Sequence, residues 1–163
     1  MQTDSETLRQ AMRFWATGVT IVTSAHNGVE HGMTVSSFTS LSLVPPQILI
    51  SLAQNSRTHE LVTNSQGFGV TVLGDEDEKL SDRFAGRIPD EGNRMVGVET
   101  FTLQTGSPLL RGGLAHFDCR VVSTLDSGTN TVFIGEVLAA QSGENPQARP
   151  LLYFDRQYRK LQK

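Results

Sequence analysis

The chain has 163 residues, of which 37% are hydrophobic and 19% charged, as in an ordered globular protein rather than a disordered or fibrous one. Its formal net charge of -3 gives no general electrostatic attraction to nucleic acid or to an anionic membrane, so neither partner is expected. We therefore expect any anionic ligand to be held by local hydrogen-bond donors rather than by a basic face.

The N-terminal segment carries acidic and polar residues where a signal peptide would need basic residues followed by an apolar stretch. No apolar run approaches the length that crosses a bilayer. The chain has the usual length of one domain, and no repeat or linker interrupts it. We expect a single cytoplasmic domain over residues 1–163. Its one cysteine, Cys119, is expected to be a buried, unreactive thiol.

The first element predicted is a short helix. Thr3 and Glu6 have capping-box spacing, apolar residues recur at helical intervals over residues 8–15, and Gly18 ends the pattern. Trp15 is interpreted as a packing residue, either of the core or of a subunit interface.

Beyond Gly18 the pattern changes to strands, rich in β-branched residues and separated by turn signals such as Asn27-Gly28. Strands are predicted at residues 19–25, 29–37, 47–53, 68–73, 114–125, 131–140 and 151–154, the last followed by a basic tail. Helices are predicted at 56–64, capped by Asn55 or Ser56, and at 75–85, with an exposed loop at 87–98. This order predicts a mainly β fold, an antiparallel barrel that is closed or nearly closed.

Alternation within the strand 114–125 places His116, Asp118 and Arg120 on one polar face. We interpret that face as solvated or as part of an interface, so His116 is not expected to act as an acid or base. The four histidines share no metal-ligand spacing with one another or with Cys119, so no metal site is predicted. Nucleophile-elbow, P-loop and Rossmann glycine patterns are also missing from the sequence.

Two polar segments stand out. Residues 34–40 hold five hydroxyl side chains in seven positions, which is compatible with a locally hydrogen-bonded strand end or with donors facing a planar polar ring. Residues 55–59, Asn-Ser-Arg-Thr-His, stand before the helix at 56–64. Their donors and the positive end of the helix dipole are compatible with simple capping or with a phosphate site.

Seven segments in this order resemble the flavin reductase family of FMN-binding split-barrel proteins, which are the reductase partners of two-component flavin monooxygenases. The segments are GMTVSSFTSLSLVPPQILISL, RTHELV, FGVTVL, LSDRFAG, SPLLRGGLAHFDCRV, TVFIGEV and RPLLYFDRQYRKL. The resemblance runs from about Met12 to Leu161. It implies an antiparallel split β-barrel with short flanking helices, and a ligand-binding role for both polar segments.

The resemblance also implies which residues bind. Residues lining the flavin ring would be Thr34, Val35, Ser36 and Ser37, with Ser40. Residues holding the ribityl chain and phosphate would be Ser51, Leu52, Ala53, Asn55, Ser56, Arg57 and Thr58. Near the flavin or the nucleotide tail would be Arg83 and Phe84, and toward the nicotinamide Tyr153, Phe154 and Tyr158. Asn130 stands where many relatives have a histidine, and it replaces only the hydrogen bond of that residue.

The implied activity is NAD(P)H-dependent flavin reduction. FAD or FMN would accept hydride from NADH or NADPH and then pass to a partner monooxygenase, and the protein would be a homodimer. No catalytic acid or base is expected, because the cofactors perform the hydride step. Two alternatives remain: another split-barrel flavoprotein, such as a pyridoxamine-phosphate-oxidase relative, and a non-catalytic flavin-binding module.

Overall fold

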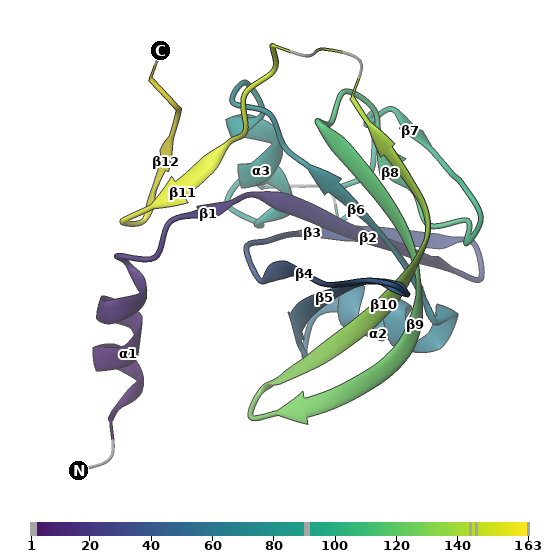
Figure 1. Ribbon diagram of the computed structural model, residues 1–163, viewed down its shortest axis with the longest axis horizontal. Coiled ribbons are helices and arrows are strands. Elements are labelled where there is room, and N and C mark those ends of the chain that lie inside the picture. The colour runs from purple at the N-terminus through teal and green to yellow at the C-terminus, as the bar shows by residue number, and fades with distance from the viewer. Residues whose placement is uncertain (1–2, 90–91, 144, 146, 163) are drawn as a thin grey trace.

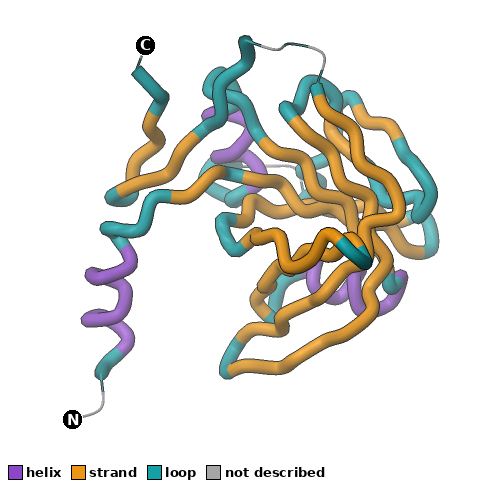
Figure 2. Tube along the Cα trace, viewed as in Figure 1, coloured by secondary structure: helices purple, strands orange, loops and turns teal. Residues whose placement is uncertain are grey.

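The computed structural model describes residues 3–89, 92–143, 145 and 147–162. Its largest part is a seven-stranded antiparallel sheet (Figure 1). In spatial order the strands are β3 (Val29–Val35), β2 (Thr20–His26), β6 (Gly67–Val72), β9 (Ala115–Ser127), β10 (Asn130–Ser142), β5 (Pro46–Ala53) and β4 (Phe38–Leu43). The sheet curls so that its strands surround a common interior (Figure 2).

Smaller elements flank the barrel. A three-stranded sheet combines β1 (Thr17–Gly18), β11 (Leu152–Phe154) and β12 (Gln157–Arg159), and β7 (Thr100–Phe101) pairs with β8 (Leu109–Leu110). The helices are α1 (Ser5–Met12), α2 (Arg57–Ser65) and α3 (Glu78–Phe84). Among the residues described, no helix is long and apolar enough to cross a membrane.

Local sequence explains the sharpest turn. Asn27 and Gly28 connect β2 to β3, and both have positive φ, 49° and 76°. A two-residue hairpin turn of this kind needs positive φ at both positions, which asparagine and glycine tolerate better than other residues. The turn therefore fixes the register in which His26 pairs with Val29.

Two groups of buried apolar side chains form the core. The first fills the barrel and includes Val22, Ile50, Phe68 and Phe133. Gly135 leaves room for it, because a Cβ there would lie 2.5 Å from the Phe68 ring. The second group lies under α3 and consists of Val19, Ile21, Leu73, Phe84, Met95, Leu110 and Leu151.

Most predicted elements are confirmed, with ends shifted by a few residues. The predicted helices at 56–64 and 75–85 are α2 and α3, and α2 is capped by Ser56 rather than Asn55. The basic tail that follows the predicted strand at 151–154 forms a further strand, β12, which was not predicted. The serine-rich segment continues into strand β4, because its backbone pairs with β5 from Phe38 onward. The described residues of the loop at 87–98 form no helix or strand, and residues 90 and 91 lie outside the described part of the chain.

Two sequence interpretations were wrong. His116 and Asp118 are buried, with 6% and 0% exposure, because the segment between β7 and β9 covers this part of the polar face of β9, whereas Arg120 on the same face is exposed. There His116 Nε2 lies 2.8 Å from Leu110 O, and Asp118 accepts from Thr105 N at 2.8 Å. The cap of α1 is Asp4, which accepts from Thr7 N, and not a Thr3 capping box.

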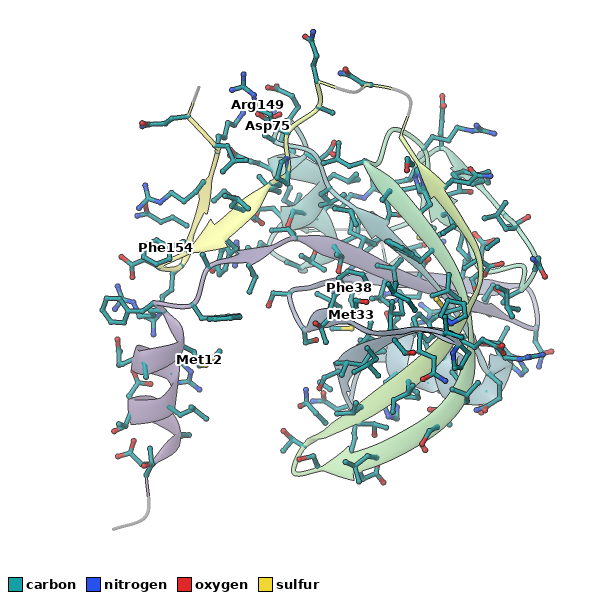
Figure 3. The ribbon with its side chains drawn as sticks, in the orientation of Figure 1. Met12, Met33, Phe38, Asp75, Arg149 and Phe154 are labelled. Carbon is teal, nitrogen blue, oxygen red and sulfur yellow. The ribbon has the colours of Figure 1, made fainter. Side chains whose placement is uncertain are left out.

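Trp15 is not a core residue of this chain, since it is 67% exposed. It follows α1, which has no buried residue and stands clear of the barrel, as the position of Met12 in Figure 3 shows. The base of α1 is fixed by Arg13, whose Nε donates to Asp155 Oδ1 at 2.6 Å.

Candidate functional site

The N-terminus of α2 borders a hollow of about 500 Å³, here called the α2 hollow, whose wall includes Asn55, Ser56, Arg57 and His59. Ser56 Oγ accepts from His59 N at 3.2 Å, which caps the helix. Arg57 is exposed, and its one hydrogen bond among the described residues is a long one, 3.5 Å, to Gly92 O. A guanidinium held this loosely, beside a helix N-terminus, is suited to bind a phosphate.

The tip of the β9–β10 hairpin is fastened to the α2 hollow. His59 Nε2 lies 2.9 Å from Thr131 Oγ1, which in turn donates to Asp126 Oδ1 at 2.6 Å. Because the Thr131 hydroxyl gives its proton to a carboxylate, it accepts from His59, which must carry a proton on Nε2. The chain of bonds fixes both the imidazole and the hairpin that brings Asn130 to this side of the barrel.

Ser51 connects the two polar segments found in the sequence. Its backbone N donates to Ser37 O at 3.2 Å, and Ser37 Oγ donates to Ser51 O at 2.7 Å. Asn130 Nδ2 donates to Ser51 Oγ at 3.2 Å. Ser37, predicted to line the ring, Ser51, predicted to hold the ribityl chain or phosphate, and Asn130, at the position of the relatives' histidine, therefore lie in one hydrogen-bonded group.

A second hollow, of about 160 Å³, lies between β3, α3 and the β11–β12 hairpin, and is here called the tyrosine hollow. Thr34 and Ser36 line it together with Arg87, Tyr153 and Tyr158. The tyrosine rings meet edge to face with centroids 5.6 Å apart, a favourable aromatic geometry. The structure thus brings both C-terminal tyrosines to the serine-rich segment, although they are more than 100 positions away in sequence.

Arg87 ties the tyrosine hollow together. Its Nη2 lies 3.2 Å from Tyr153 OH, its Nη1 forms a 3.0 Å ion pair with Asp82, and its guanidinium lies over both rings at 5.7 and 5.8 Å. The hydrogen bond to Tyr153 raises the pKa of Arg87 above its ordinary value. Burial raises the pKa of Tyr158, so its hydroxyl stays protonated at neutral pH and donates to Asp82 at 2.7 Å.

The sequence pattern did not mark Arg87, Asp82 or Ser81 as site residues, and the Ser81 carbonyl accepts from Thr34 Oγ1 at 2.6 Å. His59 was also not predicted, although its place within the Asn-Ser-Arg-Thr-His segment was a usable signal. Arg87 gave no such signal, since it stands in the glycine- and proline-rich stretch taken to be an exposed loop.

Four predicted binding residues have buried side chains: Val35 at 5% exposure, and Leu52, Thr58 and Phe84 at 0%. Thr58 Oγ1 lies 2.8 Å from His31 Nδ1, so its hydroxyl serves the interior. Any contact that these four make with a ligand would come from the backbone. Ala53, the last residue of β5, is half-buried opposite Asn130.

Three more predicted residues lie at the margins. Arg83 Nη2 donates to Val96 O at 2.5 Å, which ties it to the 87–98 loop. Ser40 is exposed on β4 opposite Ile48. Phe154 follows Tyr153 on β11, so its side chain points to the other face of the strand (Figure 3).

Over the described residues, no group of three or more histidine, cysteine, aspartate or glutamate side chains is placed to hold a metal. The donors that are present, a guanidinium, a helix N-terminus, hydroxyls and amides, fit a phosphorylated ligand with a polar ring. A family model described as a flavin reductase like domain matches residues 12–162. The chain belongs to the flavin reductase family.

Individual relatives cover nearly the whole chain. NADH-dependent flavin reductase StyB of Pseudomonas fluorescens is 40% identical over 156 residues, which are 95% of this chain and 89% of that protein. The reductase component of 4-nitrophenol 4-monooxygenase/4-nitrocatechol 2-monooxygenase of Rhodococcus opacus is 37% identical over 151 residues, 93% of this chain and 78% of that protein. Both names agree with the activity implied by the sequence.

The solved structure of the styrene monooxygenase flavin reductase (SMOB) from Pseudomonas putida S12 resembles this fold with a TM-score of 0.83. It is 38% identical, and the match covers 96% of this chain and 97% of that one. The predictions of a split-barrel fold and of a flavin reductase are confirmed.

Proposed function

We propose that this protein oxidises NADH with FAD or FMN and releases the reduced flavin to a separate flavin-dependent monooxygenase. The proposal is supported by family membership over residues 12–162, by the donors that line the two hollows, and by the hydrogen-bonded group of Ser37, Ser51 and Asn130. NADH is proposed as the reductant because it is the nucleotide named for the StyB relative. A cytoplasmic location fits a reaction that depends on this nucleotide.

Arg57 and the first turn of α2 would hold the flavin phosphate. The hydroxyls and backbone of Ser36 and Ser37 would face the ring, and Tyr153 and Tyr158 would border the nicotinamide. When bound, the flavin supplies the redox chemistry: NADH, flavin and one proton give NAD⁺ and reduced flavin. The protein would hold the two rings in reacting geometry, and the hydride step needs no side-chain acid or base because hydride would pass directly from the nicotinamide to the flavin. Tyr158 keeps its proton and donates it to Asp82 in a hydrogen bond.

The reduced flavin has to leave the protein, which limits how tightly the site should bind flavin. One exposed arginine and several neutral donors bind a phosphate less tightly than a cluster of charges would. Such a site allows the reduced flavin to leave for the oxygenase, as the proposed role requires.

We propose that the working form is a homodimer in which a second copy covers α1. An eight-residue helix is not stable by itself in water, and α1 has no buried residue. Four large apolar side chains on the helix or just after it are between 53% and 81% exposed: Leu8, Met12, Phe14 and Trp15. Light scattering at micromolar concentration should give twice the chain mass. A monomer that still reduces flavin would contradict the dimer.

The decisive experiment follows NADH absorbance after mixing the purified chain with NADH or NADPH and with FAD or FMN. We expect steady oxidation of NADH that requires both flavin and protein. Flavin binding without oxidation of either nucleotide would instead indicate the non-catalytic module.

A further inference from the structure

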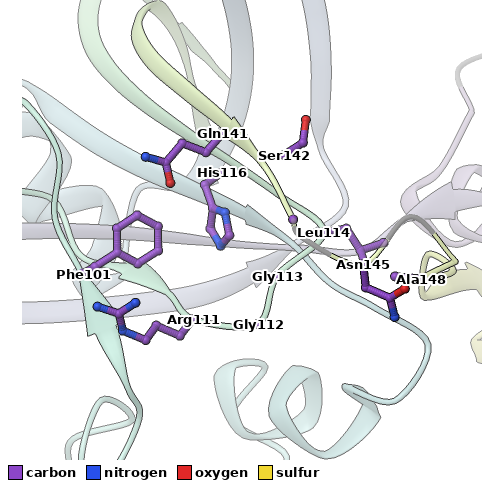
Figure 4. A pocket seen from close by; sticks show the side chains of 11 residues that line it. Phe101, Arg111, Gly112, Gly113, Leu114, His116, Gln141, Ser142, Asn145 and Ala148 are labelled. Atoms are coloured by element: carbon purple, nitrogen blue, oxygen red, sulfur yellow. The ribbon is translucent and has the colours of Figure 1, made fainter.

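A cavity of about 450 Å³ opens at one end of the β9–β10 pair, away from both hollows of the candidate site. Phe101 of β7 and Arg111 line one side, His116 of β9 and Gln141 of β10 another, and the Gly112–Gly113 backbone runs between them (Figure 4). The volume is in the range of ordinary small-molecule sites. Neither the proposed hydride transfer nor the flavin contacts use any of these residues.

Register shows that this cavity is separate from the tyrosine hollow. One row of paired residues crosses four strands: Thr34 of β3, Ile21, Thr71 and His116 of β9. Three strand spacings of about 4.8 Å place His116 roughly 14 Å from Thr34 along the curved sheet. The cavity is also far from Asn130 of the candidate site. Asn130 lies at the opposite end of β10 from Gln141, eleven positions away, or about 35 Å along the strand.

Among the described residues, no acidic side chain neutralises the positive charge of Arg111 in the cavity. The Arg111 guanidinium lies 5.4 Å from the centroid of the Phe101 ring, and within the described ranges it has neither an ion pair nor a side-chain hydrogen bond. No aspartate or glutamate is among the described residues that line the cavity. Stacking on Phe101 holds the guanidinium in place while its outer donors stay available, which favours an anionic group.

His116 adds a second polar group next to the same ring. Its imidazole meets Phe101 edge to face at 5.0 Å, and its Nε2 donates to Leu110 O at 2.8 Å. Its Nδ1 makes no hydrogen bond to any residue in the described part of the chain, and no fully buried side-chain nitrogen or oxygen there lacks a partner. Nδ1 therefore keeps contact with the cavity and can bind a polar substituent.

Gly113 holds the wall close to the imidazole. A Cβ on this residue would lie 2.3 Å from Thr71 Cγ2 and 2.9 Å from His116 Nε2, so glycine is required for this approach. The resulting cavity combines an aromatic face, a cation fixed above that face and a polar nitrogen at its edge. We propose that it binds a small aromatic carboxylate, with the carboxylate on Arg111, the ring against Phe101 and a ring hydroxyl on His116 Nδ1.

The test is a titration of the full chain with benzoate and with 4-hydroxybenzoate, followed by backbone amide NMR shifts. We expect saturable shifts centred on Gly112, Gly113 and Ser142, with tighter binding of 4-hydroxybenzoate. Cyclohexanecarboxylate and benzyl alcohol, which lack the aromatic ring and the charge respectively, should bind more weakly than benzoate. Arg111→Gln should raise the benzoate dissociation constant roughly tenfold to a hundredfold, as expected for loss of a charge-assisted contact.

Arg120→Gln is the matched control, because Arg120 is an exposed arginine on the same strand whose partner is Glu136. It should leave benzoate affinity unchanged, as should saturating FMN. Displacement of benzoate by FMN would place the binding in the flavin site and overturn the proposal. Unchanged affinity in Arg111→Gln, absence of saturation, or preference for AMP over both benzoates would overturn it as well.

Discussion

The two hollows of the candidate site use their arginines in opposite ways. Arg57 in the α2 hollow has one long hydrogen bond, 3.5 Å to Gly92 O, whereas Arg87 in the tyrosine hollow contacts Asp82, Tyr153 and Tyr158. A loosely held guanidinium can give its donors to a ligand, while one already bound to three side chains mainly fixes their positions. The α2 hollow should therefore determine flavin affinity, and the tyrosine hollow should determine how the second substrate is placed.

Arg57→Ala should have the largest effect. Loss of a charge-assisted phosphate contact costs about 1.5–3 kcal/mol, so flavin affinity should fall roughly tenfold to a hundredfold. The maximal rate at saturating flavin should change little, because the contact is the same before and after hydride transfer. Flavin dissociation constants and saturated turnover measure the two effects separately.

Arg120→Ala, at an exposed site on β9, is the control for loss of one positive charge. Lower turnover in Arg57→Ala with unchanged flavin affinity would move Arg57 to the nicotinamide side. The α2 hollow would then not be the part of the site that determines flavin affinity.

Thr131→Val should destabilise the fold near the α2 hollow. Thr131 is 5% exposed and connects His59 to Asp126, so valine leaves the His59 donor without its acceptor. We expect a loss of about 1–2 kcal/mol, or roughly 2–8 °C in melting temperature for a chain of this size. Thr131→Ser keeps the hydroxyl and should stay near the parent value. Equal melting temperatures for the two variants would show that the bond chain does not hold the hairpin.

Arg87→Met should act on the nucleotide and spare the flavin. It removes the contacts that orient Tyr153 and Tyr158 while keeping a long apolar side chain over their rings. We expect the KM for NADH to rise about fivefold, equivalent to about 1 kcal/mol, with the flavin dissociation constant unchanged. A variant that loses flavin affinity and keeps its KM for NADH would reverse the roles of the two hollows.

The difference between the two hollows also explains which site residues could be predicted from the sequence. The α2 hollow is local: Ser56 and Arg57 are consecutive, at a helix start that the sequence marks clearly. The tyrosine hollow joins Arg87 to Tyr153 and Tyr158, 66 and 71 positions away, so only the folded chain reveals it. His116 shows another limit. Alternation separates the two faces of a strand, but it does not say which face another segment covers.

Ser56 gives the smallest effect and the finest distinction, between capping and ligand binding. Its Oγ accepts from His59 N, which leaves the hydroxyl proton free to donate to a phosphate. Ser56→Ala removes both roles and should cost about 1 kcal/mol of stability, or roughly 2–4 °C in melting temperature, with a few-fold loss of flavin affinity.

Ser56→Asp separates the two roles. Aspartate is as good a cap as serine, so the melting temperature should stay near the parent value. Its negative charge at the helix N-terminus opposes a bound phosphate, so flavin affinity should fall further than in Ser56→Ala. Thermal melts and flavin titrations of both variants decide the matter. If Ser56→Asp binds flavin as tightly as the parent chain, the phosphate does not lie at the α2 N-terminus, and Ser56 only caps the helix.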